Sequence, residues 1–324
     1  MRAATGGMVS LLGADPATYE PHPLHRGERT YLETNCYTDV LIELLHARGD
    51  EPLAALGFLV RMDFEGDQWT FFKPPPGDLE ALFGVDIHEM QPYRPLDEQL
   101  ERQLAAGRCM IVELDSWFLP DTAATSYRAE HVKTSVAVES IDRAGQRLRY
   151  FHNAGYHELG GEDYLGALRI GAPAAPEVLP PYAEIVRFDA GERLRGDALR
   201  AAARERLREH LRLRPPQNPF ERFGAQLADD LPELLAGDAA GYHAYAFATV
   251  RMAGSAFELL GAHVDWLLGP AGAEAAAACA RIADGSKLLS FKLARRKPFD
   301  PTPALESMAA EWRDVVEALD GELG

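Results

Sequence analysis

The chain has 324 residues and a formal net charge of -17 at pH 7, with 47% hydrophobic and 26% charged residues. This length favours two domains, or one domain with a large extension, and the acidic balance argues against nucleic-acid binding because phosphate is repelled. No apolar run reaches the roughly 18 residues of a membrane-spanning helix, and the apolar MVSLLGA lacks the basic flank of a signal peptide. We therefore expect a cytoplasmic protein that binds neither nucleic acid nor membrane.

The first part of the chain mixes irregular, helical and strand-like patterns. Residues 1–28, rich in Gly, Pro and His, predict an irregular lead-in. Apolar residues at helical spacing predict a helix that is capped by Thr34 or Asn35 and ends near Gly49. The next segments predict strands at GFLVRMDF, WTFFK and VDIHEM, and helices over 78–83 and 96–106.

The middle of the chain predicts strands and the remainder predicts helices. CMIVELDSWFL has the apolar start of a buried strand, VKTSVAVESID alternates like a half-buried one, and RLRYFHN returns after the turn RAGQ. After Pro176 helical patterns dominate, at 197–212, 219–236, 241–269, 271–294 and 303–320. We therefore predict an α+β domain over 29–175 and a helical domain over 176–324.

The three cysteines have different settings. They are an odd number without a CxxC pair, which predicts neither a disulfide framework nor a cysteine zinc site. Cys109 begins an apolar strand and Cys279 lies in an alanine-rich helix, so both resemble inert core residues. Cys36 falls in the first turn of a helix, where the partial positive charge favours the reactive thiolate. A buried structural cysteine is the alternative interpretation of Cys36.

An activated thiol needs a base, and the base needs a group that orients it. His131 opens the alternating strand, and Asn153 ends the returning strand 22 residues later. Two antiparallel strands joined at RAGQ place these two residues near the same end of a sheet, so we favour Asn153 as the orienting group. Asp115, at the end of its own apolar strand, is the other candidate; it can orient the base, bind substrate or cap the turn before Pro120.

The order of these motifs resembles a known fold. A Cys at a helix start, then ELDSWFLPDT, a His-led strand and YFHNAGY resemble the papain-like fold of bacteriocin-processing cysteine peptidases and, more closely, the N-terminal domain of the butirosin-pathway aminoacyl transferase. ETNCYTDVLIELLHARG, FEGDQWTFFKPP and YFHNAGY further resemble an uncharacterised bacterial family that stands beside carrier proteins and aminoacyl-carrier ligases. The resemblance implies a papain-like domain over about residues 29–170 with Cys36 as nucleophile, His131 as general base and acid, and Asn153 as orienting residue.

One position departs from the papain-like pattern. Such peptidases carry a Gln about six residues before the Cys, as part of the oxyanion hole, and this chain has Thr30 there. The oxyanion would then be held by the Cys36 backbone N–H with a second donor, for which the side chains of Asn35 and Gln68 are candidates. Losing such a donor typically slows acyl transfer by about 10²- to 10³-fold. This departure disfavours proteolysis more than transfer from an activated thioester.

Other candidate residues carry weaker signals. Trp69 is more typical of a core residue, although it can also line a substrate channel. His22 with His25, and His152 with His157, lack a recognised metal-ligand spacing, so we predict no metal site.

The function that these residues predict is a cysteine-dependent acyl or aminoacyl transfer from a carrier-protein thioester to a small-molecule amine. The protein would need no cofactor of its own, since phosphopantetheine would be carried by the acyl carrier protein. The basic stretches 193–222 and 287–297 would receive this acidic partner, with Arg204, Arg208 and Arg212 on one helix face. Helix faces with internally paired charges are the alternative. A cysteine amidase or peptidase, or an inert binding module of the same fold, are the alternative functions.

Overall fold

The structure is a computed structural model that describes residues 7–27, 29–171 and 180–324. It divides the chain into two compact units, each made of three segments. The first unit holds Met1–Gly27, Cys36–Pro52 and Leu79–Arg193, and the second holds Glu28–Asn35, Leu53–Asp78 and Leu194–Gly324. The predicted boundary after residue 175 lies outside the described residues, and the first unit continues beyond it. The lead-in, as far as it is described, is mostly irregular and forms part of the first unit.

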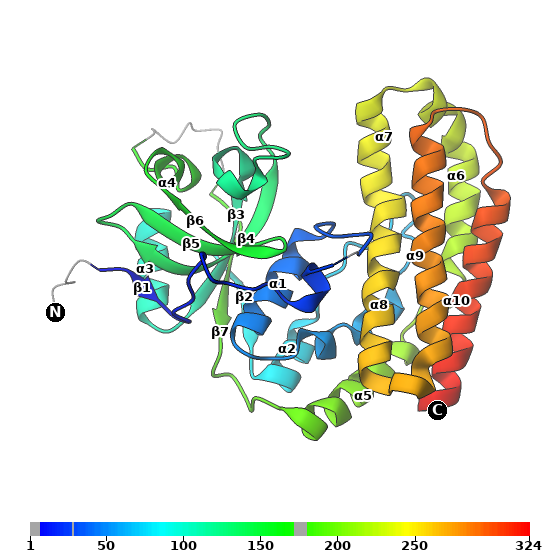
Figure 1. Ribbon diagram of the computed structural model, residues 1–324, viewed down its shortest axis with the longest axis horizontal. Coiled ribbons are helices and arrows are strands. Elements are labelled where there is room, and N and C mark those ends of the chain that lie inside the picture. The colour runs from blue at the N-terminus through cyan, green and yellow to red at the C-terminus, as the bar shows by residue number, and fades with distance from the viewer. Residues whose placement is uncertain (1–6, 28, 172–179) are drawn as a thin grey trace. The chain divides into compact units, whose positions relative to one another are not determined.

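An antiparallel sheet with the strand order β2-β7-β3-β4-β5-β6 forms the centre of the first unit, and β1 pairs with β4 (Figure 1). Every strand pair in it is antiparallel, which matches the alternating patterns of the sequence. The strands are β1 (Val9–Ser10), β2 (Asp86–Met90), β3 (Cys109–Asp115), β4 (Lys133–Asp142), β5 (Arg147–His152), β6 (Gly155–Gly160) and β7 (Ala183–Arg187).

Helices cover both faces of this sheet. Because side chains alternate along a strand, Met110, Val112 and Leu114 of β3 share one face, and there they join a hydrophobic core with α3 (Leu96–Ala105) and α4 (Glu162–Ala167). Cys109, Ile111, Glu113 and Asp115 point to the opposite face, which α1 (Cys36–Ala47) covers. Asp115 and the first residue of α1 therefore belong to the same side of the sheet.

Helix α1 forms because its apolar residues recur at helical spacing and because a glycine ends it. Val40, Leu41, Leu44 and Leu45 are fully buried. The chain leaves the helix through Gly49, whose φ of 71° lies in the left-handed region that favours glycine. Cys36 is the first helical residue, as the sequence predicted.

The second unit is helical. Its long helices run side by side, with α8 and α10 both packed on α9 and α6 packed on α10 (Figure 1). An aromatic cluster of Trp69, Phe220, Phe223 and Phe257 fills part of its core. The helices are α5 (Gly196–Arg212), α6 (Pro219–Ala236), α7 (Ala239–Ala246), the π-helical turn η6 (Phe247–Arg251), α8 (Met252–Leu268), α9 (Ala273–Ala294) and α10 (Thr302–Leu323).

The structure confirms an α+β organisation with an antiparallel sheet and a helical C-terminal region, but it corrects three local predictions. GFLVRMDF contains the 3₁₀ helix η3 (Gly57–Arg61) instead of a strand. WTFFK contributes only an isolated bridge between Phe64 and Trp69. The strand β7 follows Pro176, in the part of the chain where we predicted a helical domain. No helix among the described residues combines the length and the apolar composition needed to cross a lipid bilayer.

Candidate functional site

Cys36 begins α1 and its side chain is partly exposed. The backbone N–H groups of a first helical turn have no partner within the helix, and they give that end of the helix a partial positive charge. Within the described part of the chain, the Cys36 sulfur accepts and donates no hydrogen bond. The thiol is therefore not held by a structural contact, and it lies at a helix end that favours negative charge.

The other two cysteines are buried core residues, as predicted. Cys109 and Cys279 are both 0% exposed. The Cys109 thiol donates to the carbonyl oxygen of Val138 at 3.1 Å. Burial raises the pKa of the Cys109 thiol far above its usual range, with a further contribution from the charge of Glu139, and burial alone does the same for Cys279. Neither thiol is available as a thiolate near neutral pH.

His131 and Asp115 form a hydrogen-bonded pair where β3 ends and just before β4 begins. The Nδ1 atom of His131 lies 2.6 Å from a carboxylate oxygen of Asp115, and the other carboxylate oxygen accepts the Trp117 backbone N–H at 3.0 Å. The imidazole stacks on the Trp117 ring, with ring centres 4.5 Å apart and planes 9° apart. Because an ionised carboxylate only accepts, Nδ1 is the donor of this hydrogen bond, and in the neutral imidazole the lone pair is then on Nε2. The His131 side chain is 66% exposed, so Nε2 is accessible to a reacting group.

The pairing of His131 differs from the one we favoured. Asn153 lies in the two-residue turn between β5 and β6, with a φ of 46° in the left-handed region that Asn tolerates. Its neighbour His152 hydrogen-bonds Thr134, which lies three residues beyond His131 along the chain. Asn153 is thus a turn residue, and the residue that is hydrogen-bonded to His131 is Asp115.

Helix α1 and the His131 pair lie on the same side of the sheet. The hydroxyl of Tyr37, next to Cys36, donates to Glu184 of β7 at 2.6 Å, and Glu184 pairs with Ile111 of β3. Asp115 lies further along the same face of β3. No hydrogen bond joins Cys36 and His131 in the described part of the structure.

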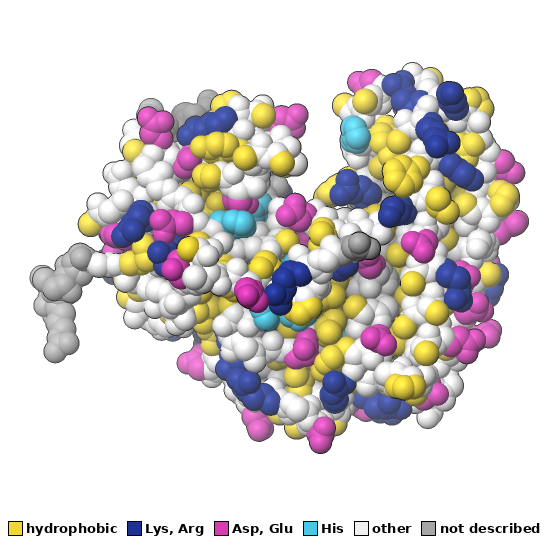
Figure 2. Space-filling view, in the orientation of Figure 1, with side chains coloured by type: hydrophobic (Ala, Val, Ile, Leu, Met, Phe, Trp, Pro, Cys, Tyr) yellow, Lys and Arg dark blue, Asp and Glu magenta, His cyan; other side chains and the backbone are white. Residues whose placement is uncertain are grey.

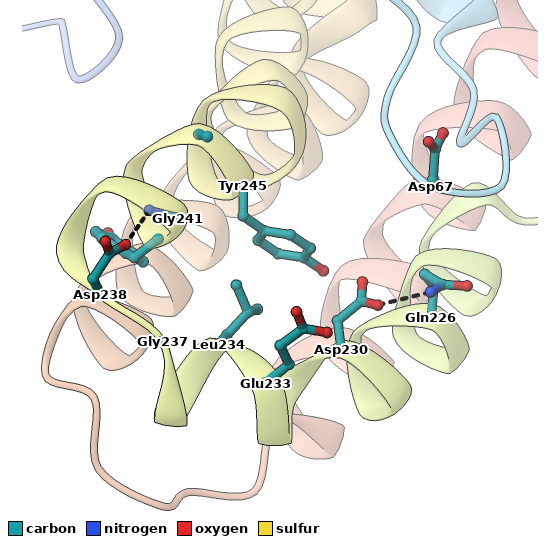
Figure 3. Close-up of a pocket in the computed structure, with 11 residues that line it drawn as sticks. Asp67, Gln226, Asp230, Glu233, Leu234, Gly237, Asp238, Gly241 and Tyr245 are labelled. Carbon is teal, nitrogen blue, oxygen red and sulfur yellow. Dashed lines mark hydrogen bonds between the residues drawn. The ribbon is translucent and has the colours of Figure 1, made fainter.

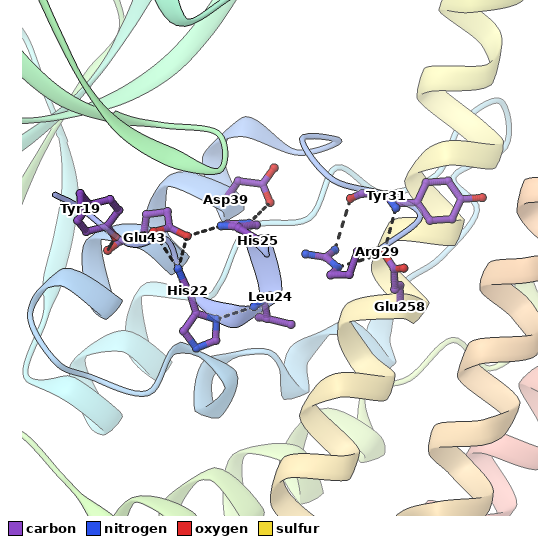
Figure 4. Close-up of polar contacts among 9 residues, drawn as sticks. All are labelled: Tyr19, His22, Leu24, His25, Arg29, Tyr31, Asp39, Glu43 and Glu258. Carbon is purple, nitrogen blue, oxygen red and sulfur yellow. Dashed lines mark hydrogen bonds and ion pairs between the residues drawn. The ribbon is translucent and has the colours of Figure 1, made fainter. Parts of the chain in front are cut away.

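A buried charged cluster fixes the middle of α1, at Asp39 and Glu43 (Figure 4). The His25 imidazole contacts Glu43 through Nδ1 at 2.5 Å and Asp39 through Nε2 at 3.1 Å, and the Tyr19 hydroxyl donates to Glu43. The His22 backbone N–H also donates to Glu43, at 3.0 Å. Burial lowers the pKa of His25, but the hydrogen bonds and charges of the two carboxylates outweigh it and raise the pKa to about 8. The protonated imidazole ties the lead-in segment to α1.

Sequence reasoning missed this cluster and a second one. Asp39 and Glu43 occupy i and i+4 positions on the buried side of α1, and carboxylates are seldom buried without a cationic partner, so the sequence held a signal. In the second cluster, His152 contacts Asp121 at 2.5 Å and Thr134 at 2.8 Å. Among the residues that the structure describes, no group of three His, Cys, Asp or Glu side chains could hold a metal ion.

Of the predicted oxyanion and substrate residues, Asp115 lies in the first unit, whereas Asn35, Gln68 and Trp69 belong to the second, and two of these three have structural roles. The Asn35 side chain is 2% exposed, and its amide donates one N–H to the carbonyl oxygen of Phe72 at 2.7 Å, so it has a structural role. Trp69 is 2% exposed within the aromatic cluster, which makes it a core residue and not part of a channel. Gln68 lies on the surface, in the loop before the Phe64–Trp69 bridge.

Two of the three predicted docking arginines also have internal partners. Arg204 donates to the carbonyl oxygen of Glu322 at 2.5 Å, and Arg208 donates to that of Leu323 at 2.8 Å, both at the C-terminal end of α10. Arg212, at the end of α5, is exposed. Helix C-termini favour cations, so the first two arginines stabilise α10.

The comparisons with known proteins match the chain in two consecutive parts, and the first match includes residues 28–35 and 53–78 of the second unit. The model of the DUF1839 N-terminal domain matches residues 20–188, and that of the DUF1839 C-terminal domain matches residues 196–321. No curated protein sequence matches the chain.

Proposed function

We propose that this chain, which belongs to the DUF1839 family, is a papain-like cysteine-dependent acyl or aminoacyl transferase. The observation that carries the proposal is the Asp115–His131 pair, which leaves Nε2 unoccupied on the sheet face that the Cys36 helix covers. An imidazole with one nitrogen fixed by a carboxylate and the other exposed is suited to general acid and base chemistry.

In the first half of the reaction, His131 takes the proton of Cys36 and the thiolate attacks the thioester carbonyl carbon of the donor. A bond forms from Cys36 sulfur to this carbon, and the bond to the donor thiol breaks. The imidazolium of His131 returns its proton to the departing thiolate. Thioester exchange is nearly balanced in energy, so the acyl group reaches Cys36 without being committed to water.

In the second half, an amine attacks the acyl carbon of the Cys36 thioester. His131 takes the proton that the amine nitrogen loses, and the Cys36 thiolate leaves. The oxyanion donor that we propose is the backbone N–H of Cys36, the first residue of α1, where the partial positive charge of the helix end also favours an oxyanion. It acts in place of the Asn35 amide, one N–H of which is bonded to Phe72. The His131 ring has to turn toward Cys36 when the donor binds, and its exposure permits this movement.

The donor that we propose is a carrier protein that bears the acyl group on phosphopantetheine. Carrier proteins are acidic, so a basic surface would receive them. The C-terminal part of α9 supports such a surface, since Lys287 and Lys292 are exposed beside Leu288 and Phe291, which are 61% and 57% exposed. Figure 2 shows Lys and Arg side chains gathered with hydrophobic ones over the upper part of the helical unit. We therefore propose that the carrier protein docks on the C-terminal part of α9 and not on Arg204 and Arg208 of α5.

Hydrolysis of the same intermediate is the second candidate, because the exposed His131 ring is open to water. The fate of the acyl group separates the two functions. The purified protein is incubated with glycyl- and acetyl-pantetheine thioesters, with the same groups on a bacterial acyl carrier protein, and with or without an ordinary primary amine such as ethanolamine. A transferase gives a lasting acyl-protein adduct that the amine discharges as an amide, whereas a hydrolase releases free acid without it. If none of these thioesters acylates the protein or is consumed, the proposal fails and a binding module remains.

A further inference from the structure

The segment 116–132 joins β3 to β4 and carries His131 next to its last residue. It consists of the two short 3₁₀ helices η4 (Ser116–Phe118) and η5 (Pro120–Thr122) and of turns. Fixing such a segment in one conformation costs backbone entropy, which specific contacts have to offset. The contacts that hold segment 116–132 therefore also decide where the His131 ring lies.

A buried ionic cluster holds the middle of this segment. The Asp121 carboxylate, in η5, contacts the Nδ1 atom of His152 and accepts the Tyr150 hydroxyl, both at 2.5 Å. The Nε2 atom of His152 lies 2.8 Å from the Thr134 hydroxyl. The side chains of His152 and Asp121 are only 1% and 7% exposed. Residues of β4 and β5 thus anchor the segment through Asp121.

The burial of Asp121 makes this anchor strong. Carboxylates are normally left in water, and Asp67 and Asp238 of the helical unit, for example, are exposed (Figure 3). Burial raises the pKa of the Asp121 carboxyl, but the hydrogen bond and charge of His152, together with the Tyr150 hydroxyl, outweigh burial and lower this pKa. The carboxylate is therefore ionised, and without its partner it would be an uncompensated buried charge.

The cluster lies on the face of the sheet that α1 does not cover. Thr134 of β4 is the direct partner of Leu114 of β3, and opposed residues point to the same face. Leu114 belongs to the core with α3 and α4. The next pair, Asp115 with Lys133, points to the other face, which α1 covers. The cluster and the Asp115–His131 pair therefore lie at the same end of β3 and β4, on opposite faces.

Hydrogen bonds within the segment connect the cluster to the His131 ring. Thr122, the neighbour of Asp121, donates its hydroxyl to the Ser116 carbonyl oxygen at 3.1 Å. The Ser116 N–H in turn donates to the Val132 carbonyl oxygen at 2.9 Å. Ser116 and Val132 each directly follow one residue of the pair that contains His131. A displacement of η5 would therefore be passed on to the imidazole.

We propose that the Asp121–His152 pair positions His131. The pair holds segment 116–132 so that the imidazole stays bonded to Asp115 and keeps Nε2 directed outward. This inference rests on the proposed function, in which that nitrogen exchanges a proton with Cys36. Asp121 and His152 are positioning residues, because they act through His131 and not on the reacting atoms. The alternative is a pair that stabilises the fold without any effect on His131.

The first test does not depend on catalysis. Long-range ¹H–¹⁵N NMR spectra of the full-length protein, labelled at its histidine nitrogens and kept at about pH 8.5, show which ring nitrogen carries the proton. The spectrum of His131→Gln assigns the His131 signals. In the wild type we expect the form of His131 that is protonated on Nδ1. In Asp121→Ala, which removes the anchor, the signals should move toward the mixture of tautomers of an unrestrained imidazole.

The matched control is Asp78→Ala, which breaks a buried His–Asp pair of the same kind in the helical unit. There the Asp78 carboxylate lies 2.6 Å from the Nε2 atom of His210. Both variants should lower the melting temperature, since each removes a buried ionic contact, but only Asp121→Ala should change the His131 signals. Tyr150→Phe removes a single hydrogen bond of the cluster. It should change these signals less, and it carries the test if Asp121→Ala does not fold.

The second test is the single-turnover rate at which acetyl-pantetheine acylates Cys36. Misplacing a reacting group by about 1 Å can slow a reaction about 10²-fold. We therefore expect Asp121→Ala to lower the rate about tenfold or more, while the half-saturating concentration of the thioester stays the same. Asp78→Ala should react at the wild-type rate.

The proposal is overturned if the His131 signals of Asp121→Ala match those of the wild type, or if Asp121→Ala and Asp78→Ala slow acylation equally. If the wild type itself is not acylated, the proposed transferase function fails. The NMR comparison then still decides whether the pair positions His131.

Discussion

The Asp115 carboxylate holds the Nδ1 atom of His131 at 2.6 Å and thereby directs the Nε2 atom of the ring outward. Because of this hydrogen bond, we expect Asp115 to orient His131 and Asn153 not to do so. Asp115→Asn should lower the transfer rate strongly, by about 10²-fold or more, since an amide can present its N–H to the ring and select the wrong tautomer. Asn153→Ala should have a much smaller effect, because Asn153 is a turn residue.

The readout for this pair is the single-turnover acylation rate as a function of pH. The Asp115→Asn profile should be displaced, while that of Asn153→Ala should keep the wild-type shape. Equal losses in the two variants would mean that Asp115 does not act through His131.

A second prediction concerns the reactivity of the three thiols. Iodoacetamide should alkylate Cys36 well before Cys109 and Cys279, because the latter two are 0% exposed and burial raises the pKa of each. The measurement is peptide mapping of the native protein over a time course, with the denatured protein as the control in which all three react. If Cys36 is the last to be labelled, it is a structural residue.

A third prediction follows from the His25 cluster. A pKa of about 8, compared with about 6.5 in the unfolded chain, means that the folded state holds the proton more tightly. The stabilisation is fully present below about pH 6.5 and is lost as the pH rises through about 8, and a shift of this size corresponds to about 2 kcal/mol.

Urea unfolding followed by circular dichroism at pH 6 and pH 9 measures this effect. The free energy of unfolding of the wild type should decrease from pH 6 to pH 9. His25→Gln should be less stable than the wild type at pH 6, and its free energy of unfolding should not show this decrease. His88→Gln changes an exposed histidine and is the control, expected to behave like the wild type. If the free energy of unfolding of His25→Gln decreases with pH as much as that of the wild type, other groups cause the decrease.

A fourth prediction concerns the arginines of α5. Arg208→Ala should reduce the free energy of unfolding by about 1 kcal/mol, because it removes a hydrogen bond to the last turn of α10. Arg212→Ala, on the exposed end of the same helix, should leave stability unchanged.

A separate prediction concerns the docking surface. Association with an acyl carrier protein, measured at low salt, should be weakened by Lys292→Glu. If Arg208→Ala abolishes association with the carrier protein and leaves stability unchanged, the carrier protein binds α5, as the sequence predicted.

The sequence was most informative where a periodic pattern was long or a residue stood at a defined position in an element. Helix α1 and strands β3 to β5 follow their apolar periods, and Cys109 and Cys279 are buried as their apolar neighbours indicated. GFLVRMDF misled because a short apolar run fits a buried strand and a short helix equally well. Strand β7 was missed because its partners, β2 and β3, lie far from it in the sequence.

For the candidate site, the sequence indicated the residues but not which of them are hydrogen-bonded to each other. His131 and Asp115 were both singled out, but their pairing depends on strand register, which the hairpin turn alone does not determine. The side-chain alternation from Cys109 to Asp115 places Asp115 on the α1 face, but the sequence does not reveal which face α1 covers.

The most direct test of the proposed nucleophile is to locate the acyl group on the protein. Wild type, Cys36→Ala and Cys109→Ala are mixed with acyl-loaded carrier protein for a single turnover, quenched in acid, digested and analysed by tandem mass spectrometry. The account predicts one thioester adduct, on Cys36, which is present in the Cys109→Ala variant and absent from a folded Cys36→Ala variant. An adduct on another residue, or transfer at the full wild-type rate by Cys36→Ala, would contradict it.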